Sequence, residues 1–109
     1  MVNVLITGVS VVDFIFQLNE IPKENEKFRA ENASISGGGI AANAAVAVSR
    51  LGGTPTLVSR LGYDQIGSMI KNDLIEEGVN VNFTKQFQGN RSSFSSVYID
   101  KKGDRQVVN

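Results

Sequence analysis

The sequence has 109 residues, of which 41% are hydrophobic and 20% charged, the composition of an ordinary globular protein rather than a disordered or fibrous one. Lys plus Arg and Asp plus Glu number 11 each, so no net charge attracts nucleic acid or an anionic membrane. Cysteine and histidine are both absent, which excludes disulfides, thiolate metal sites, Cys nucleophiles and Ser–His catalysis.

The N-terminal sequence "MVNVLITGVS" lacks the basic region and the long apolar run of a signal peptide. Nowhere in the chain are about 18 consecutive apolar residues available to cross a bilayer. A chain without cysteine also suits a reducing compartment. We therefore expect a cytoplasmic protein that binds neither membranes nor nucleic acid.

Three strands are predicted in the first third of the chain. Residues 2–7 are short, apolar and β-branched, as in a buried strand of a mostly parallel sheet. Residues 14–22, "FIFQLNEIP", alternate apolar side chains with others until the run ends at Pro22. Residues 27–36, "KFRAENASIS", alternate in a more polar way, which favours an exposed antiparallel strand.

Two helices and a strand follow. Residues 39–51 are rich in alanine and run into two glycines, the pattern of a helix and its end. Residues 56–61 read as the next strand. Residues 64–77 carry an apolar stripe, and Asp64 and Gly78 are suited to begin and end a second helix.

After Val79 the pattern changes to strands, "VNFTKQFQ", "SFSSVYID" and "RQVVN", with a hairpin turn at residues 101–104. Ser92, Ser93, Ser95 and Ser96 favour an exposed strand over nucleophilic catalysis, because no histidine accompanies them. These short polar strands do not suit the interior of an α/β core. We therefore expect a core of about residues 1–12 and 37–80 and a projecting β lid of about residues 13–36 and 81–109. With three plausible core strands, the chain reads as part of a larger protein.

The stretch "SISGGGIAANAAVAVSRLGG" allows several interpretations. Gly37, Gly39 and Ala42 match the spacing G-x-G-x-x-A of a dinucleotide site, but the preceding strand is polar, and Arg60 stands where an acidic residue is wanted. A tight turn in which the glycines only avoid clashes is a second interpretation. A third is a ligand site. Glycines at a helix start expose backbone N–H groups, and the Asn43 carboxamide can both donate to and accept from a neutral polyol.

Longer stretches resemble a known family. "GGGIAANAAVAVSRLGG" followed by "LVSRLGYDQIGSMIKNDLIEEGVN" resembles the N-terminal signature of the ribokinase-like, or PfkB, carbohydrate kinases, and "ITGVSVVDF" resembles their first strand with its sugar-binding aspartate. The resemblance runs over essentially the whole chain. "KFRAENASISGGG", "NFTKQF" and "DKKGDRQVVN" look most similar to the sulfofructose kinase branch, whose acceptor sugar carries a sulfonate.

The resemblance implies a partial Rossmann-type α/β core with a β-strand lid, and transfer of a phosphoryl group from ATP with Mg²⁺ to a sugar hydroxyl. It also implies that Asp13 binds sugar hydroxyls, that Gly38 and Gly39 contact the sugar through their backbone, and that Asn43 completes the polar wall. A carboxylate can accept from two adjacent hydroxyls, so the chemistry agrees. The family's G-A-G-D turn with its catalytic aspartate has no match in the sequence. We therefore expect no catalytic or metal-binding residue here, an absent C-terminal ATP-binding part, and no activity of the chain alone.

An acceptor with an anionic tail would need cations or amides near it. Lys27, expected on a lid strand, and Asn109, at the end of the hairpin, are the first candidates, and Arg29 and Arg91 are weaker ones. Lys27 can equally be a solvated edge-strand lysine that discourages aggregation. Apolar lid positions such as Phe14, Phe16 and Phe94 predict a homodimer formed through the lid.

Three other functions stay open. A nucleoside kinase of the same family would use Asp13 on a ribose in the same way. The chain could also be a non-catalytic sugar-binding or regulatory module, or an NADP-binding domain. A G-A-G-D motif downstream in the parent gene would distinguish an enzyme from a binding module.

Overall fold

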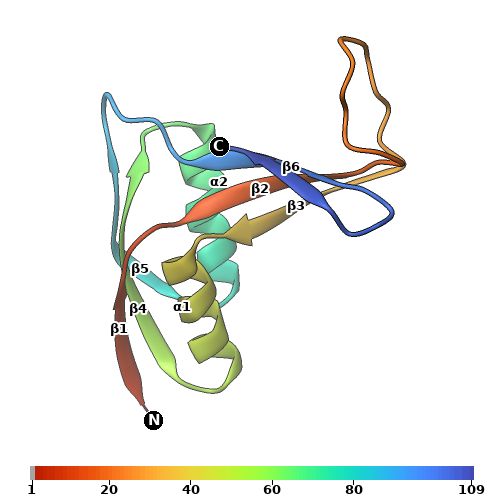
Figure 1. The fold of residues 1–109 in the computed structure, drawn as a ribbon. Coiled ribbons are helices and arrows are strands. Elements are labelled where there is room, and N and C mark those ends of the chain that lie inside the picture. Colours follow the sequence, from red (N-terminus) through yellow and green to blue (C-terminus); the bar gives the residue numbers. More distant parts are fainter. Residues whose placement is uncertain (1) are drawn as a thin grey trace. The chain divides into compact units, whose positions relative to one another are not determined.

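The computed structural model describes residues 2–109 (Figure 1). The chain forms two compact units. Residues 2–12 and Gly37–Ser93 make up one of them, the core unit, and Asp13–Ser36 with Phe94–Asn109 make up the other, the sheet unit. The chain therefore passes between the units three times, after residues 12, 36 and 93.

The core unit is built on a three-stranded parallel sheet in the order β1-β4-β5. Its strands are β1 (Asn3–Thr7), β4 (Thr54–Gly62) and β5 (Asn80–Phe87). In their registers Leu5 pairs with Thr56 and Val58 with Phe83, and the pairing of β4 with β5 is irregular between Thr56 and Val58. The strands predicted at residues 2–7 and 56–61 are confirmed, each with shifted ends.

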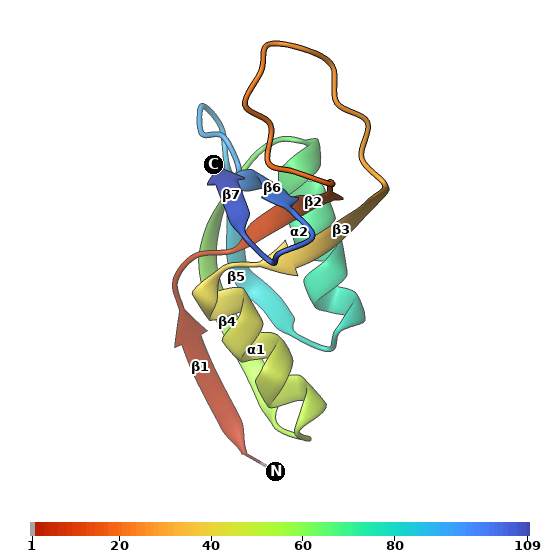
Figure 2. The same cartoon turned by 45° about the vertical axis from the view of Figure 1, so that its right-hand side comes forward.

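Two helices cover one face of this sheet (Figures 1 and 2). Helix α1 (Ile40–Arg50) packs on β1 and β4, and α2 (Gln65–Glu76) packs on β4 and β5. Small alanines let α1 approach the strands closely, while α2 contributes larger aliphatic side chains. The buried apolar residues of this layer are Ala41, Ala42, Ala45, Leu57, Leu61, Ile70, Leu74, Val79 and Val81.

The opposite face of the sheet carries side chains that are exposed in this chain. Successive strand residues point to opposite faces, so Leu5, Val58 and Phe83 lie on this open face and are 72%, 36% and 56% exposed. Phe87 lies there as well, beneath the guanidinium of Arg60, whose Cζ is 4.9 Å from the ring centroid. Parallel sheets are normally covered on both faces.

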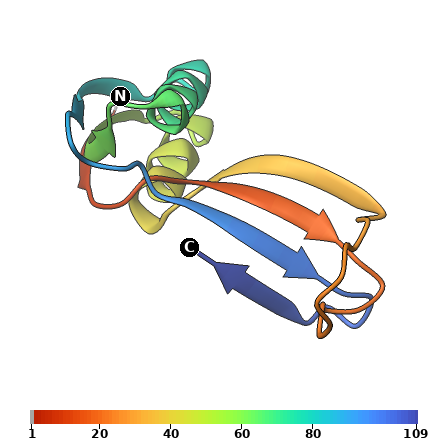
Figure 3. The ribbon, with the colours of Figure 1, turned by 90° about the horizontal axis from the view of Figure 1, so that it is seen from above.

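A four-stranded sheet in the order β3-β2-β6-β7 supplies the strands of the sheet unit. Its members are β2 (Val11–Gln17), β3 (Asn32–Gly38), β6 (Phe94–Ile99) and β7 (Arg105–Val108). Figure 3 shows β2 and β6 running in the same direction, with β3 and β7 opposed to them. Aromatic rings bridge β2 and β6. Phe14 and Phe94 meet edge to face at 6.0 Å, and Phe16 lies 5.9 Å from Tyr98.

The predicted hairpin between β6 and β7 is confirmed. The strands pair antiparallel, with Ile99 opposite Arg105. The turn is stabilised by the Asp100 carboxylate, which accepts the backbone N–H groups of Lys102 and Asp104, both at 3.0 Å. Gly103 adopts φ 86°, a conformation that favours glycine.

Placing residues 81–93 in the projecting layer was wrong. Strand β5 pairs parallel with β4 in the core sheet, and these residues belong to the core unit. Polar and apolar side chains alternate along β5 because one face of the core sheet is exposed and the other is covered by the helices. Thr84 on the other face is fully buried, and its hydroxyl donates to the Leu57 carbonyl at 2.8 Å, so a polar residue is satisfied there.

Three further expectations need correction. Lys27 is not on a strand: β3 begins only at Asn32, and Lys27 lies in the loop before it. Phe14, Phe16 and Phe94 are half-buried rather than exposed, because they pack on the rings of neighbouring strands. Ser92 and Ser95 are buried, at 1% and 5% exposure, rather than solvent-facing.

Within residues 2–109 no helix is both long and apolar enough to cross a membrane.

Candidate functional site

The glycine run ends where α1 begins, and Gly39 is the residue at that junction. Its φ of 92° is unfavourable for any side chain, and a Cβ atom there would lie 2.6 Å from the Val9 carbonyl oxygen. The Ala42 N–H donates to the same carbonyl at 3.3 Å. Glycine at position 39 therefore lets the start of α1 press against the loop that follows β1.

That loop is held to the sheet by a short chain of hydroxyls. Ser10, only 3% exposed, donates from its Oγ to the Oγ of Ser59 at 2.9 Å, and Ser59 in turn donates to the Gly8 carbonyl at 2.7 Å. The Gly8 N–H donates to the Val58 carbonyl at 3.1 Å. The loop after β1 and the start of α1 thus form a braced backbone surface at the carboxyl end of the parallel strands.

The start of α1 offers hydrogen-bond donors but no charged side chain in its first turn. Gly38 is buried, and the Gly39 cap provides no side-chain acceptor for the first N–H groups of the helix. Asn43 lies one turn further on, with its N–H bonded to the Gly39 carbonyl at 2.9 Å and its side chain exposed. Backbone N–H groups and a carboxamide suit hydroxyl groups or an anion as ligand.

Asp13 lies on β2, at the first residue of the sheet unit, and is half-buried. The residue before it, Val12, is anchored in the core unit, where its N–H donates to the Ser93 carbonyl at 3.3 Å. Asp13 therefore follows directly on a fixed point of the backbone. The other sugar-binding candidates, Gly38, Gly39 and Asn43, belong to the core unit.

The candidates for an anionic group lie in the sheet unit. Lys27 is exposed in the loop before β3. Asn109 directly follows β7, and its carboxamide N–H₂ donates to the Phe94 carbonyl at 3.1 Å and to Ser95 Oγ at 3.0 Å. The amide donor of Asn109 is therefore engaged inside the unit, whereas the Lys27 side chain is exposed.

A polar junction at Asp64 was only partly predicted. Asp64 caps α2 as expected, with Oδ1 accepting the Gly67 N–H at 2.7 Å, but Oδ2 also accepts the Ser92 N–H at 2.9 Å. These bonds from Ser92 and Gly67, with the nearby charge of Arg91, hold the pKa of Asp64 below its usual value. The contact with Ser92 joins residues 28 positions apart, and no local pattern signals it.

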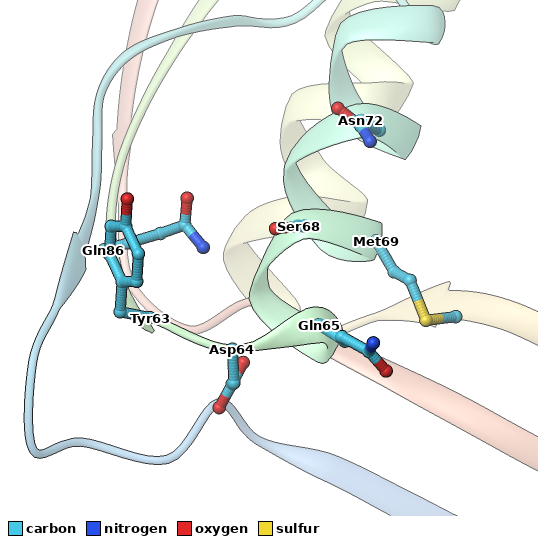
Figure 4. Close-up of a pocket in the computed structure, with 7 residues that line it drawn as sticks. All are labelled: Tyr63, Asp64, Gln65, Ser68, Met69, Asn72 and Gln86. Atoms are coloured by element: carbon cyan, nitrogen blue, oxygen red, sulfur yellow. The ribbon is translucent and has the colours of Figure 1, made fainter.

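A cavity of about 570 Å³ opens beside this junction (Figure 4). Its lining is mostly uncharged and polar and comes from the first turns of α2, the end of β4 and β5: Tyr63, Asp64, Gln65, Ser68, Met69, Asn72 and Gln86. The Gln86 amide is partly engaged, since Nε2 donates to the Gly62 carbonyl at 3.2 Å. Among residues 2–109 no group of three or more Asp, Glu, His or Cys side chains gathers to hold a metal ion.

Comparison with known proteins agrees with the residue pattern. The model of the pfkB family carbohydrate kinases matches residues 1–109. The chain is 28% identical over 106 residues to a ribokinase of Dictyostelium discoideum, covering 97% of this chain and 33% of that protein. It is 38% identical over 71 residues to a fructokinase of Escherichia coli, covering 65% of this chain and 23% of that protein.

Solved structures give the same result for the fold. A crystal structure from Agrobacterium tumefaciens, assigned as a ribokinase, superposes with a TM-score of 0.91 at 34% identity, covering 97% of this chain and 35% of that one. The ribokinase of Arabidopsis thaliana complexed with ribose and ATP superposes with a TM-score of 0.84 at 24% identity, covering 95% and 34%. The chain thus spans about a third of the length of its relatives.

Proposed function

The chain belongs to the pfkB family of carbohydrate kinases and has their ribokinase-like α/β fold, and from that premise we propose that it is the acceptor-binding portion of an ATP-dependent sugar kinase. The observation that carries the proposal is the start of α1. There the first turn of the helix has no side-chain cap, at the carboxyl end of the parallel strands, the place where open α/β sheets bind ligands.

The roles follow from the chemistry of each group. The Asp13 carboxylate accepts hydrogen bonds from two adjacent sugar hydroxyls, which a neutral side chain of the same size would do less strongly. Backbone N–H groups at Gly38 and Gly39 donate to the sugar, since no side chain caps this end of the helix. The Asn43 carboxamide both donates to and accepts from further hydroxyls.

Residues 13–36 and 94–109 form a lid over the acceptor in this proposal. A lid excludes water from the reacting groups and commits the bound sugar to reaction. We also propose a homodimer formed through the lid, but through other residues than Phe14, Phe16 and Phe94, which are half-buried. The large apolar side chains exposed there are Phe28 in the loop before β3, at 40% exposure, and three residues on the outer strands, Ile35 on β3 and Val107 and Val108 on β7, at 56% to 59% exposure. Light scattering of the complete kinase tests for a dimer.

ATP supplies the phosphoryl group and Mg²⁺ neutralises its developing charge in this class of reaction. We assign the contacts with ATP and the metal ion to the part of the kinase beyond the matched third. The chain's own residues bind and orient the acceptor. The catalytic base belongs, in this proposal, to the part of the kinase that relatives carry beyond the matched third, so the 109 residues alone transfer no phosphoryl group.

A screen of the complete protein for ATP consumption tests the proposal. Neutral sugars, phosphorylated sugars, sulfonated sugars and nucleosides are offered separately. We expect turnover with at least one sugar, and an Asp13→Asn variant should raise KM for that sugar by roughly tenfold or more, since a charge-assisted hydrogen bond is lost. Turnover with nucleosides alone would identify a nucleoside kinase, and sugar binding without turnover a non-catalytic module.

Lys27 determines the finer choice among sugars. An ammonium group favours an acceptor with a sulfonate or phosphate, as in the sulfofructose kinases. Lys27→Ala should then raise KM for a sulfo- or phospho-sugar much more than for a neutral one. Lys23→Ala in the same loop is the matched control, because Lys23 is equally exposed. Equal effects of Lys27→Ala on both kinds of sugar would exclude the anionic acceptor.

A further inference from the structure

The two carboxylate oxygens of Asp64 have different partners. Oδ1 accepts the Gly67 N–H at 2.7 Å, a bond that begins α2 and that any good N-cap residue provides. Oδ2 accepts the Ser92 N–H at 2.9 Å, and this bond contributes nothing to the helix. Figure 4 shows Asp64 at the start of α2, with its side chain directed toward the segment that leads into β6. Asp64 therefore joins α2 to a distant stretch of backbone.

Ser92 is itself held from two sides. It is 1% exposed, and its Oγ accepts the Gly62 N–H at 2.8 Å while lying 3.3 Å from the Gly62 carbonyl, to which it donates. No room remains for larger residues around it, because a Cβ atom on Gly62 would lie 2.6 Å from Ser92 N and one on Gly67 would lie 2.8 Å from Ser92 Oγ. The backbone at Ser92 is thus clamped between β4 and α2.

The clamp continues to the strand of Asp13. Ser93, the next residue, accepts the Val12 N–H through its carbonyl at 3.3 Å. Val12 is 5% exposed and immediately precedes Asp13 on β2. One continuous set of hydrogen bonds and peptide bonds therefore runs from the Asp64 carboxylate through Ser92, Ser93 and Val12 to Asp13.

We propose that Asp64 is a positioning residue for the acceptor sugar: by holding Ser92 it fixes the part of β2 from which the Asp13 carboxylate reaches the sugar hydroxyls. This inference rests on the proposed function of Asp13. Both oxygens of Asp64 are engaged by backbone N–H groups, so the role proposed for Asp64 involves no contact with the sugar. Asp64 sets the position of Asp13. Loss of the contact between Asp64 and Ser92 therefore weakens sugar binding and leaves nucleotide binding unaltered.

Two substitutions separate this role from helix capping. Serine is a good N-cap but is too short to reach Ser92 as well, whereas alanine removes both bonds. In the complete kinase, Asp64→Ser and Asp64→Ala should therefore raise KM for the sugar alike, by about tenfold or more, because small misplacements of a binding group are costly. KM for ATP should stay within about twofold in both variants. A sugar KM equal to that of the wild type in Asp64→Ser would show that Asp64 acts only as a helix cap, and would overturn the proposal.

Thr84→Val is the matched control for stability. It removes the buried hydrogen bond from Thr84 to Leu57 in the same unit without touching Ser92, so it should lower Tm and leave the sugar KM unchanged. Should Thr84→Val raise the sugar KM as much as Asp64→Ser, general destabilisation would account for both and the proposal would fail.

Amide hydrogen exchange provides a readout that needs no activity. Exchange at Val12 and Ser92 should rise in Asp64→Ser and Asp64→Ala and not in Thr84→Val. Unchanged exchange at Val12 would contradict the clamp whatever the kinetics show. If the wild-type protein phosphorylates no sugar, the proposed function fails, while exchange at Val12 still decides whether Asp64 holds the strand.

Discussion

The backbone of Gly39 has φ 92°, and the Val9 carbonyl occupies the space where a side chain would begin. Gly52 has nearly the same φ, 90°, but no atom lies within 4 Å of its Cβ position. The two glycines share the same backbone strain on substitution and differ in the available space. They therefore form a natural pair for measuring the clash alone.

Gly39→Ala should lower the free energy of unfolding by about 3 kcal/mol, from backbone strain and overpacking together. Gly52→Ala should lower it by about 1 kcal/mol, from strain alone. Urea denaturation of the two variants measures the difference. Equal losses would mean that the loop after β1 moves away from α1 at no cost, contrary to the braced contact at Ser10 and Ser59.

Asp64 makes stability depend on pH in a known direction. Its pKa is lowered in the folded protein by Ser92 and Gly67, so its contribution is fully present above the unfolded pKa of about 4 and is lost as pH falls through the folded value. Asp64→Asn should be less stable than wild type at pH 7, and this gap should narrow below about pH 4. Urea denaturation at pH 7, 5, 4 and 3 measures it, and a gap that stays constant would contradict the assignment.

At the scale of elements, the two helices are tied together at their C-terminal ends. Ser49 at the end of α1 donates to the Glu77 carbonyl at 2.6 Å, and Gly78 leaves room for it, since a Cβ there would lie 2.7 Å from the hydroxyl. Arg50 and Glu77 form an ion pair at 2.7 Å in the same place, with the Arg50 side chain 68% exposed. Water and salt weaken such a surface pair.

Ser49→Ala should therefore lower the free energy of unfolding by about 1 kcal/mol, because a carbonyl at a helix end loses its donor. Arg50→Gln should have a smaller effect that shrinks further in salt. Denaturation of both variants at low and high ionic strength measures this. A larger loss from Arg50→Gln than from Ser49→Ala would reverse the ranking of the two contacts.

The elements differ in how well the sequence predicts them. Helix α2 and the β6–β7 turn are predicted by local signals, namely Asp64 as a helix cap and Gly103 as a turn residue. Both are confirmed, since Asp64 caps α2 and Gly103 has a positive φ. Strand β5 was placed in the wrong sheet because Thr84 and Lys85 look solvent-facing. Thr84 is in fact fully buried, and its hydroxyl is satisfied by the Leu57 carbonyl on another strand, a partner that only the strand pairing reveals.

The candidate site likewise has features that the local sequence predicts and contacts that only the fold shows. The glycine run predicts the start of a helix, and α1 does begin at Ile40, directly after Gly39. That Gly38, Gly39 and Asn43 bind a ligand stays a prediction. The bond from Asp64 to Ser92 and the bond from Val12 to Ser93 join residues far apart in sequence. Nothing local to Ser92 distinguishes it from Ser93 and Ser96, which are only half-buried, so its burial is visible only in the fold.

At the scale of the whole molecule, the open face of the core sheet is the largest departure from an ordinary soluble protein. Leu5 and Phe83 are more than half exposed on it, at opposite edges of a parallel sheet. Apolar faces of this kind bind other apolar surfaces. The 109-residue chain on its own should therefore self-associate and bind a hydrophobic dye.

Replacing Leu5 and Phe83 together by threonine should reduce both effects while keeping strand propensity. Light scattering and dye fluorescence measure the change. Leu51→Thr is the control, because Leu51 is 88% exposed but lies at the end of α1, away from the open face. A similar reduction in Leu51→Thr would show that general surface hydrophobicity, not this face, drives association.

The three passages of the chain between its units have a consequence for synthesis on the ribosome. Strands β2 and β3 leave the exit tunnel early, but β6, which pairs with β2, follows only after the whole of α1, β4, α2 and β5. A two-stranded hairpin is marginal in water, so the first half of the sheet unit must wait, unfinished, while the core unit is made. All strands and helices of the core unit are thus synthesised before the sheet that contains β2 can be completed.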